Sequence, residues 1–230
     1  AGCCNSWCCC NCCVMANAVI GVICLIIAVA AISWLWGINS FNLWHVKVGL
    51  FSGEHFRSGA LTGGSSVTQS FKFSDPYCKD QFSSAVCDSW KSAGSASAAF
   101  TILALLSAIP ATFFGVVFAM AEGRTILIVE SNSDRAAQFG SALNFVTAIL
   151  AIIAVIAYAG VDREIGKGSF GSGSGITIPF GYSFYCALGA STAFFISGFI
   201  HVGFLCCCKE NRSREGSGGG DSAAAHQSKL

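Results

Sequence analysis

Cysteine is the most chemically versatile residue in this sequence, because a thiol can be oxidised, acylated or bound to a metal. The chain of 230 residues contains 14 cysteines, and ten of them lie in two clusters beside long apolar runs. The clustered cysteines are Cys3, Cys4, Cys8, Cys9, Cys10, Cys12 and Cys13, followed near the other end by Cys206, Cys207 and Cys208. Cytoplasmic cysteines next to a membrane span are the usual acceptors of S-palmitoyl groups. We therefore treat all ten as candidate acylation sites.

Zinc binding and unmodified thiols are the two alternatives to consider for these clusters. Cys9 and Cys12 have the Cys-x-x-Cys spacing of zinc ligands, and the pair one residue later repeats it. A structural zinc site, however, uses two such pairs separated by a knuckle or a loop, and neighbouring cysteines cannot all point at one ion. We therefore predict no metal site and no cofactor. Acylation of some cysteines is the leading hypothesis, and unmodified thiols are the alternative.

Cys78 and Cys87 stand apart from the clusters, in a long polar segment between two apolar runs. Such a pair predicts one disulfide, which requires an oxidising, exoplasmic compartment. Two unrelated buried thiols are the alternative. If the pair is oxidised, its segment is extracellular and the terminal clusters are cytoplasmic and reduced. Cys24 and Cys186 fall inside apolar runs, where we expect them to be small packing residues.

The elements that must position these cysteines are membrane helices. Hydrophobic residues make up 53% of the chain and charged residues only 11%, whereas a soluble domain carries about 25% charged residues. A spanning helix needs roughly 20 mostly apolar residues. Four runs meet this requirement, at residues 14–38, 93–120, 139–161 and 180–205. The predicted fold is therefore an α-helical membrane protein, a left-handed bundle of four transmembrane helices.

The runs contain no Asp, Glu, Lys or Arg, and His201 is their one histidine. An intramembrane carboxylate or lysine marks an ion or proton pathway by default, so this pattern disfavours a pump or coupled transporter. The sequence also lacks HExxH, GxSxG and phosphate-loop motifs. The formal net charge of +1 provides no basic surface for nucleic acid. We predict neither an enzyme nor a nucleic-acid-binding protein.

An even number of spans places both termini on the same side of the membrane. The Lys and Arg counts of the two sides are nearly equal, but Lys209, Arg212 and Arg214 favour a cytoplasmic C-terminus. The first run is interpreted as a retained helix, since no charged residue precedes Lys47 and Trp34 and Trp36 resemble interfacial anchors.

The expected domain organisation follows from these spans. It comprises a cytoplasmic Cys-rich N-terminus (1–13), a transmembrane domain (14–207) with extracellular loops 39–92 and 162–179, and a disordered cytoplasmic tail (208–230).

The two extracellular loops contain strand patterns. Residues 43–51 alternate, with Trp44, Val46 and Val48 on one face, which is typical of a half-buried strand. Residues 67–73 and 176–178 offer two further short strands, and residues 58–66 have turn character. We therefore expect one small exoplasmic antiparallel sheet built from both loops.

Small and polar residues within the runs predict how the helices pack. Gly189, Ala193 and Ser197 form a small-xxx-small ladder, which serves either packing inside the bundle or lateral contact between protomers. Asn17 and Asn144 are expected to form hydrogen bonds between helices. His201 is interpreted as a residue that bonds a neighbour, with a protonation switch as the alternative.

Three short motifs of the sequence together resemble those of one known family of membrane proteins. Gly49, Leu50 and Phe51 resemble the Gly-Leu-Trp that follows the first helix in that family, with Phe51 in place of tryptophan. The Cys78 and Cys87 pair resembles its first-loop disulfide, although it lies farther along the chain. The segment 179–185, which contains Gly181, Tyr182 and Ser183, resembles the beginning of its last span, with Ser197 and Gly198 further in. With these motifs the chain resembles the claudin and peripheral-myelin-protein-like tetraspan superfamily. The resemblance implies a four-helix bundle capped by an extracellular sheet.

The predicted function is that of a structural protein of the plasma membrane. Its partners are membrane lipids, other copies of the chain in a lateral homo-oligomer or strand, and other membrane or cortical proteins. The alternative is an auxiliary subunit or pore-former that modulates ion permeation. The charges of the first loop are mixed in sign and form no evident selectivity ring, which favours the structural role.

Overall fold

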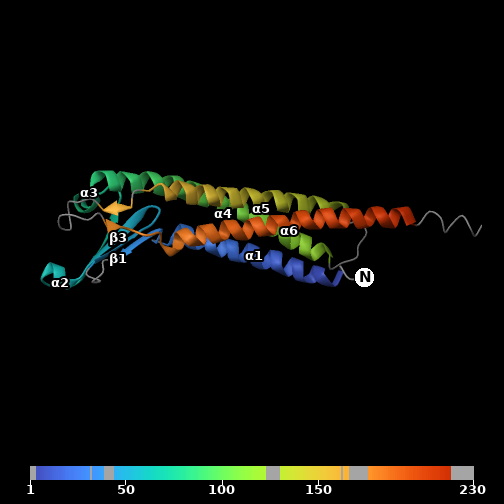
Figure 1. Ribbon diagram of the computed structural model, residues 1–230, viewed down its shortest axis with the longest axis horizontal. Coiled ribbons are helices and arrows are strands. Elements are labelled where there is room, and N and C mark those ends of the chain that lie inside the picture. Colours follow the sequence, from blue (N-terminus) through green and yellow to red (C-terminus); the bar gives the residue numbers. More distant parts are fainter. Residues whose placement is uncertain are drawn as a thin grey trace, which may run out of the picture.

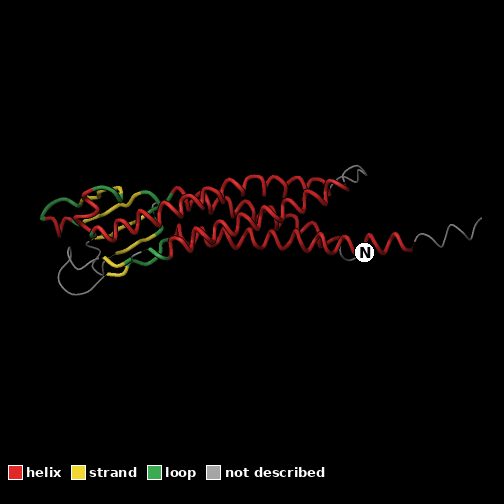
Figure 2. The backbone as a smooth tube through the Cα atoms, turned by 90° about the horizontal axis from the view of Figure 1, so that it is seen from above, coloured by secondary structure: helices red, strands yellow, loops and turns green. Residues whose placement is uncertain are grey.

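Four long helices form the body of the molecule. The computed structural model describes residues 4–31, 33–38, 44–122, 130–161, 163–165 and 176–218. The long helices are α1 (Cys4–Ala30), α4 (Ser84–Glu122), α5 (Glu130–Ala159) and α6 (Tyr182–Gly218). They lie side by side and carry a small sheet at one end (Figure 1). The first turns of α1 and the last turns of α6 both lie at the opposite end (Figures 1 and 2).

All four helices are long enough and apolar enough to cross a membrane. The stretches that meet this criterion are Cys13–Ala30, Ser84–Val116, Ala137–Ala159 and Tyr182–Gly203. The prediction of four such helices is confirmed. α4 begins well before the predicted run, and its first turns extend past the other helices into the sheet region (Figure 2).

The first predicted run extends too far along the chain. α1 ends at Ala30, and residues 35–38 form strand β1 (Leu35–Ile38) instead of helix. The Trp34 N–H donates to the Val48 carbonyl at 2.8 Å, so the backbone enters a sheet ladder as soon as the helix ends. Hydropathy could not locate the end of α1, because apolar residues that are buried in a sheet are as hydrophobic as apolar residues that face lipid.

The sheet is an antiparallel meander in the order β1-β2-β3-β4. Its other strands are β2 (Trp44–Val48), β3 (Ser52–Arg57) and β4 (Val67–Lys72). β2 and β4 agree with the predicted strands, and the alternation in β2 is confirmed because Trp44, Val46 and Val48 are buried. β3 escaped prediction, because its sequence Ser-Gly-Glu-His-Phe-Arg lacks an apolar alternation.

The last loop does not join that sheet. β5 (Glu164–Ile165) and β6 (Ile176–Thr177) form a separate two-stranded ribbon. The expectation of a single sheet from both loops is therefore wrong. The segment after β6 nevertheless lies along the outer edge of β1, through a bridge between Leu35 and Phe180 and a 3.1 Å bond from the Trp36 N–H to the Pro179 carbonyl.

Two short helices complete the first loop. α2 (Gly59–Thr62) lies within the predicted turn and ends at Gly63, whose φ of 69° is readily adopted only by glycine. α3 (Pro76–Phe82) begins with a proline in its first turn, where the missing N–H costs no hydrogen bond.

The predicted disordered tail is partly helical. α6 continues to Gly218, so residues 208–218 are helix, and that part of the prediction is wrong. Residues 219–230 lie outside the described residues.

Candidate functional site

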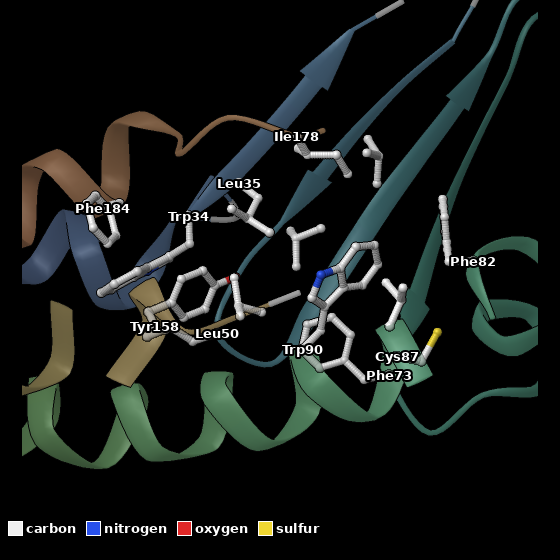
Figure 3. Close-up of a cluster of buried hydrophobic side chains, with 14 of the residues drawn as sticks. Trp34, Leu35, Leu50, Phe73, Phe82, Cys87, Trp90, Tyr158, Ile178 and Phe184 are labelled. Atoms are coloured by element: carbon white, nitrogen blue, oxygen red, sulfur yellow. The ribbon is translucent and has the colours of Figure 1, made fainter. Parts of the chain in front are cut away.

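Trp34 lies at the centre of the junction between the bundle and the sheet. It is fully buried, and its indole Nε1 donates to the Ala28 carbonyl at 2.7 Å. Its ring packs on Tyr158 and Phe184, with centroid distances of 4.7 and 6.0 Å (Figure 3). The interpretation of Trp34 as an interfacial anchor is therefore wrong, whereas Trp36 is 45% exposed.

The motif Gly49-Leu50-Phe51 forms the turn between β2 and β3. The Gly49 N–H donates to the Ser52 carbonyl at 2.8 Å, and the Gly49 carbonyl accepts from the Tyr158 hydroxyl at 3.2 Å. Leu50 points into the core, and Phe51 is 57% exposed. The turn thus ties the sheet to the end of α5, and Phe51 does not share the buried core.

Gly181 and Ser183 connect the beginning of α6 to the end of α1. The Gly181 N–H donates to the Trp34 carbonyl at 2.7 Å, and the Ser183 N–H donates to the Ser33 carbonyl at 3.1 Å. A Cβ at position 181 would clash with the Ser33 carbonyl oxygen, so glycine is required there for close approach. Tyr182, between them, is exposed.

Cys78 of α3 and Cys87 of α4 are joined by a disulfide, as predicted. Their Cα atoms lie 6.2 Å apart, within the usual range, and both residues are fully buried. The bridge fixes the short helix α3 against the projecting end of α4.

An aromatic cluster lies between this disulfide and the sheet. Phe71 belongs to β4, Phe73 follows the end of that strand, Phe82 belongs to α3 and Trp90 to α4. Phe82 and Trp90, both labelled in Figure 3, have ring centroids 5.3 Å apart. The Phe71 ring lies 5.5 Å from that of Phe82. The four rings fill the space between the inner face of the sheet and α4, so the cap has its own apolar core.

His55 is a buried histidine within this cap. Its Nδ1 lies 3.0 Å from the Tyr77 hydroxyl, and its ring faces Trp44 and Phe82. Burial, with a smaller contribution from the Arg57 charge, lowers the pKa of His55 from 6.5 to about 4. His55 is therefore neutral near pH 7. Sequence inspection missed it, because its strand has no recognisable pattern.

α5 forms polar contacts with the two helices beside it. The Ser97 hydroxyl of α4 donates to the Ala154 carbonyl at 2.9 Å, and the Ser191 hydroxyl of α6 donates to the Ala148 carbonyl at 3.0 Å. Asn144 Nδ2 lies 3.2 Å from Nδ1 of His201, and both residues are buried. The interhelical bond predicted for Asn144, and a bonded neighbour for His201, are thus present. Asn17 is half-buried.

The predicted small-residue ladder is split between two environments. Ala193 and Ser197 are buried inside the bundle. Gly189 is exposed, and a Cβ there would meet nothing within 4 Å. The three residues therefore do not form one lateral contact surface. The close helix approach occurs instead at Gly21 of α1, where a Cβ would lie 2.7 Å from the Phe194 ring.

The clustered cysteines within α1 and α6 belong to the end of the molecule opposite the sheet (Figure 1). Cys13 and Cys206 have free, exposed thiols. Cys3 lies outside the described residues, as do the side chains of the other seven clustered cysteines. Within the described part of the chain, no group of three His, Cys, Asp or Glu side chains is placed to hold a metal ion.

The chain has no match among protein-family models, and none among the curated proteins. The resemblance to the claudin-like superfamily therefore rests on the residues themselves.

Proposed function

We propose that this protein is a multi-pass structural protein of the plasma membrane that associates laterally into oligomers or strands. Its sheet faces the exoplasmic side and both termini face the cytoplasm. In this proposal the exoplasmic cap contacts neighbouring molecules, the bundle contacts them within the bilayer, and acylated termini hold the inner leaflet.

The observation that carries a structural role is the rigid connection between cap and bundle. The helix α4, of 39 residues, belongs to both parts. One apolar core continues from Phe82 and Trp90 in the cap to Trp34 and Tyr158 at the bundle. Because the cap is fixed in this way, a neighbouring molecule that binds the sheet is also held in a defined orientation relative to the helices. An assembling scaffold requires such a fixed orientation.

The exposed residues support membrane insertion. Large apolar side chains cover the outside of the helices, among them Ile23, Leu106 and Ile156. Exposed aromatic residues lie where the bundle meets the cap, namely Trp36, Phe51, Tyr182 and Tyr185. Aromatic side chains at one level of a helix bundle are typical of the membrane–water interface.

The orientation can be tested by glycosylation. Thr68→Asn creates an Asn-Gln-Ser acceptor sequence on the exposed strand β4. We expect this variant, expressed in eukaryotic cells, to gain a glycan that an endoglycosidase removes. The natural sequence Asn211-Arg212-Ser213 near the end of α6 should stay unmodified and serves as the internal control. Modification at Asn211 instead would contradict the proposed orientation.

The assembly can be tested by freeze-fracture electron microscopy of membranes that contain the protein. Ordered rows or clusters of particles are expected. Dispersed single particles at high expression would refute lateral association, whatever the orientation assay returns.

A further inference from the structure

An apolar groove lies between α1 and α4. Its volume is about 350 Å³, and it is lined by Val19, Val22 and Ile23 of α1 and by Ile109, Phe113 and Val116 of α4. Thr112 is its one polar lining residue, and the Thr112 hydroxyl donates to the Ala108 carbonyl at 2.8 Å. The other lining residues are apolar, so the groove fits a hydrocarbon chain.

The groove lies close to the cysteine cluster of α1. In a regular helix, positions seven and eleven residues apart return to nearly the same face, because each turn takes 3.6 residues. Cys12 stands seven positions before Val19 and eleven before Ile23, and Cys8 stands eleven before Val19. Both cysteines therefore hold register positions on the side of α1 that carries the groove. Cys13 is about a third of a turn away from it.

The distance along the helix matches an acyl chain. With a rise of about 1.5 Å per residue, the groove residues Val19 to Ile23 lie roughly 10–17 Å beyond Cys12 along the axis. The acyl chains of one leaflet reach across about half of the roughly 30 Å hydrocarbon core, which is ~15 Å. A long-chain acyl group is therefore long enough to span the distance from position 12 to the level of Val19 and Val22.

We infer that the groove between α1 and α4 holds a long acyl chain attached by a thioester to Cys12 of the same molecule. The inference rests on the acylation and membrane insertion proposed above. The cysteine sulfur attacks the thioester carbonyl of a long-chain acyl-coenzyme A. The new sulfur–carbon bond forms, the bond to the donor sulfur breaks, and the proton of the cysteine leaves on the coenzyme A thiol.

The covalent bond to the cysteine is the reason why this acyl chain, and not a free lipid, occupies the groove. A tethered chain binds intramolecularly, at an effective concentration set by its short reach, and does not compete as a separate molecule. Burial of each methylene away from water also contributes to holding the end of α1 at the membrane. The acyl chain thus completes the α1–α4 contact.

The test uses the full-length protein in cells fed a palmitate analogue with a terminal alkyne and a photoreactive diazirine in its chain. After illumination, we expect cross-links between the analogue and the α4 peptide that contains residues 109–116. The Cys12→Ser variant should lose these cross-links, whereas the matched Cys206→Ser/Cys207→Ser/Cys208→Ser variant should keep them.

A second pair of variants tests the groove directly. Val116→Trp fills the groove, and Leu106→Trp places the same side chain on an exposed position of the same helix. The first should reduce the α4 cross-links to background while hydroxylamine still releases the label, and the second should leave them unchanged. Label on Cys12 without α4 cross-links would overturn the inference and leave the proposed acylation standing. Absence of any hydroxylamine-sensitive label would overturn both, without affecting the orientation and assembly assays.

Discussion

The Tyr158 hydroxyl donates a hydrogen bond to the Gly49 carbonyl oxygen, 3.2 Å away and 109 residues earlier in the chain. This bond joins the end of α5 to the turn between β2 and β3. Because Tyr158 also packs on Trp34, one buried side chain connects the bundle, the helix–strand junction and the sheet. The rigid attachment of the cap depends on it.

Removal of that hydroxyl should destabilise the protein. In Tyr158→Phe the Gly49 carbonyl loses a buried donor, which costs about 1–3 kcal/mol. Denaturant unfolding of the detergent-solubilised protein, followed by tryptophan fluorescence, measures the change. The matched variant Tyr185→Phe alters an exposed tyrosine and should leave the unfolding midpoint unchanged.

The two neighbouring tryptophans should differ sharply in their effect on stability. Trp34→Ala leaves a cavity in the fully buried junction and should cost about 3–5 kcal/mol. Trp36→Ala removes a half-exposed ring and should change the free energy of unfolding much less. Equal losses for the two variants in thermal unfolding would show that Trp34 is not the centre of the junction.

Gly181, just before α6, and Gly189, within α6, should also differ in their effect on stability. Gly181→Ala drives a methyl group into the Ser33 carbonyl and should cost about 1–3 kcal/mol through strain. Gly189→Ala points into open space and should be neutral or stabilising by up to about 1 kcal/mol, since alanine favours helix. Melting temperatures of the two purified variants check the prediction. A stable Gly181→Ala protein would disprove the close approach.

Loss of the disulfide should loosen α3. The bridge closes a loop with a sequence separation of 9, and Cys78→Ser/Cys87→Ser should cost about 2–3 kcal/mol. Mass spectrometry of the intact protein after alkylation, with and without reductant, verifies the bond itself. Cys13→Ser, which alters an exposed thiol, is the control and should unfold like the parent protein.

Stability should fall as the pH is lowered from about 6.5 to about 4. His55 has a folded-state pKa of about 4 and an unfolded value of 6.5, so the unfolded chain binds the additional proton between these values. The full loss is on the order of 3 kcal/mol, and none of it should occur above pH 7. In His55→Gln, the unfolding midpoint should change less with pH across this range.

His45→Gln is the matched control for that experiment. His45 lies half-exposed on the outer face of the sheet, and its pKa is lowered less, by burial and by the Lys47 charge. Its loss should therefore leave most of the pH dependence in place. If instead His55→Gln retains the full dependence, the buried histidine is not its source.

The helices and the disulfide were accessible to prediction for simple physical reasons. A membrane span is a local property, because about 20 apolar residues suffice whatever surrounds them. The β2 alternation at Trp44, Val46 and Val48 is equally local. His55 and β3 were missed because the burial of their residues depends on α3 and α4, which lie elsewhere in the chain. The residue Trp34 was misassigned for the same reason.

By itself, the sequence determined the four apolar spans and the pairing of Cys78 with Cys87, because length, hydropathy and isolation of a cysteine pair are all readable along the chain. Only the tertiary structure decided where α1 stops, which strands share a sheet, and which small residues face a neighbour. Ser197 is buried and Gly189 is open although both belong to one ladder, because helix packing selects a face that spacing alone leaves undetermined.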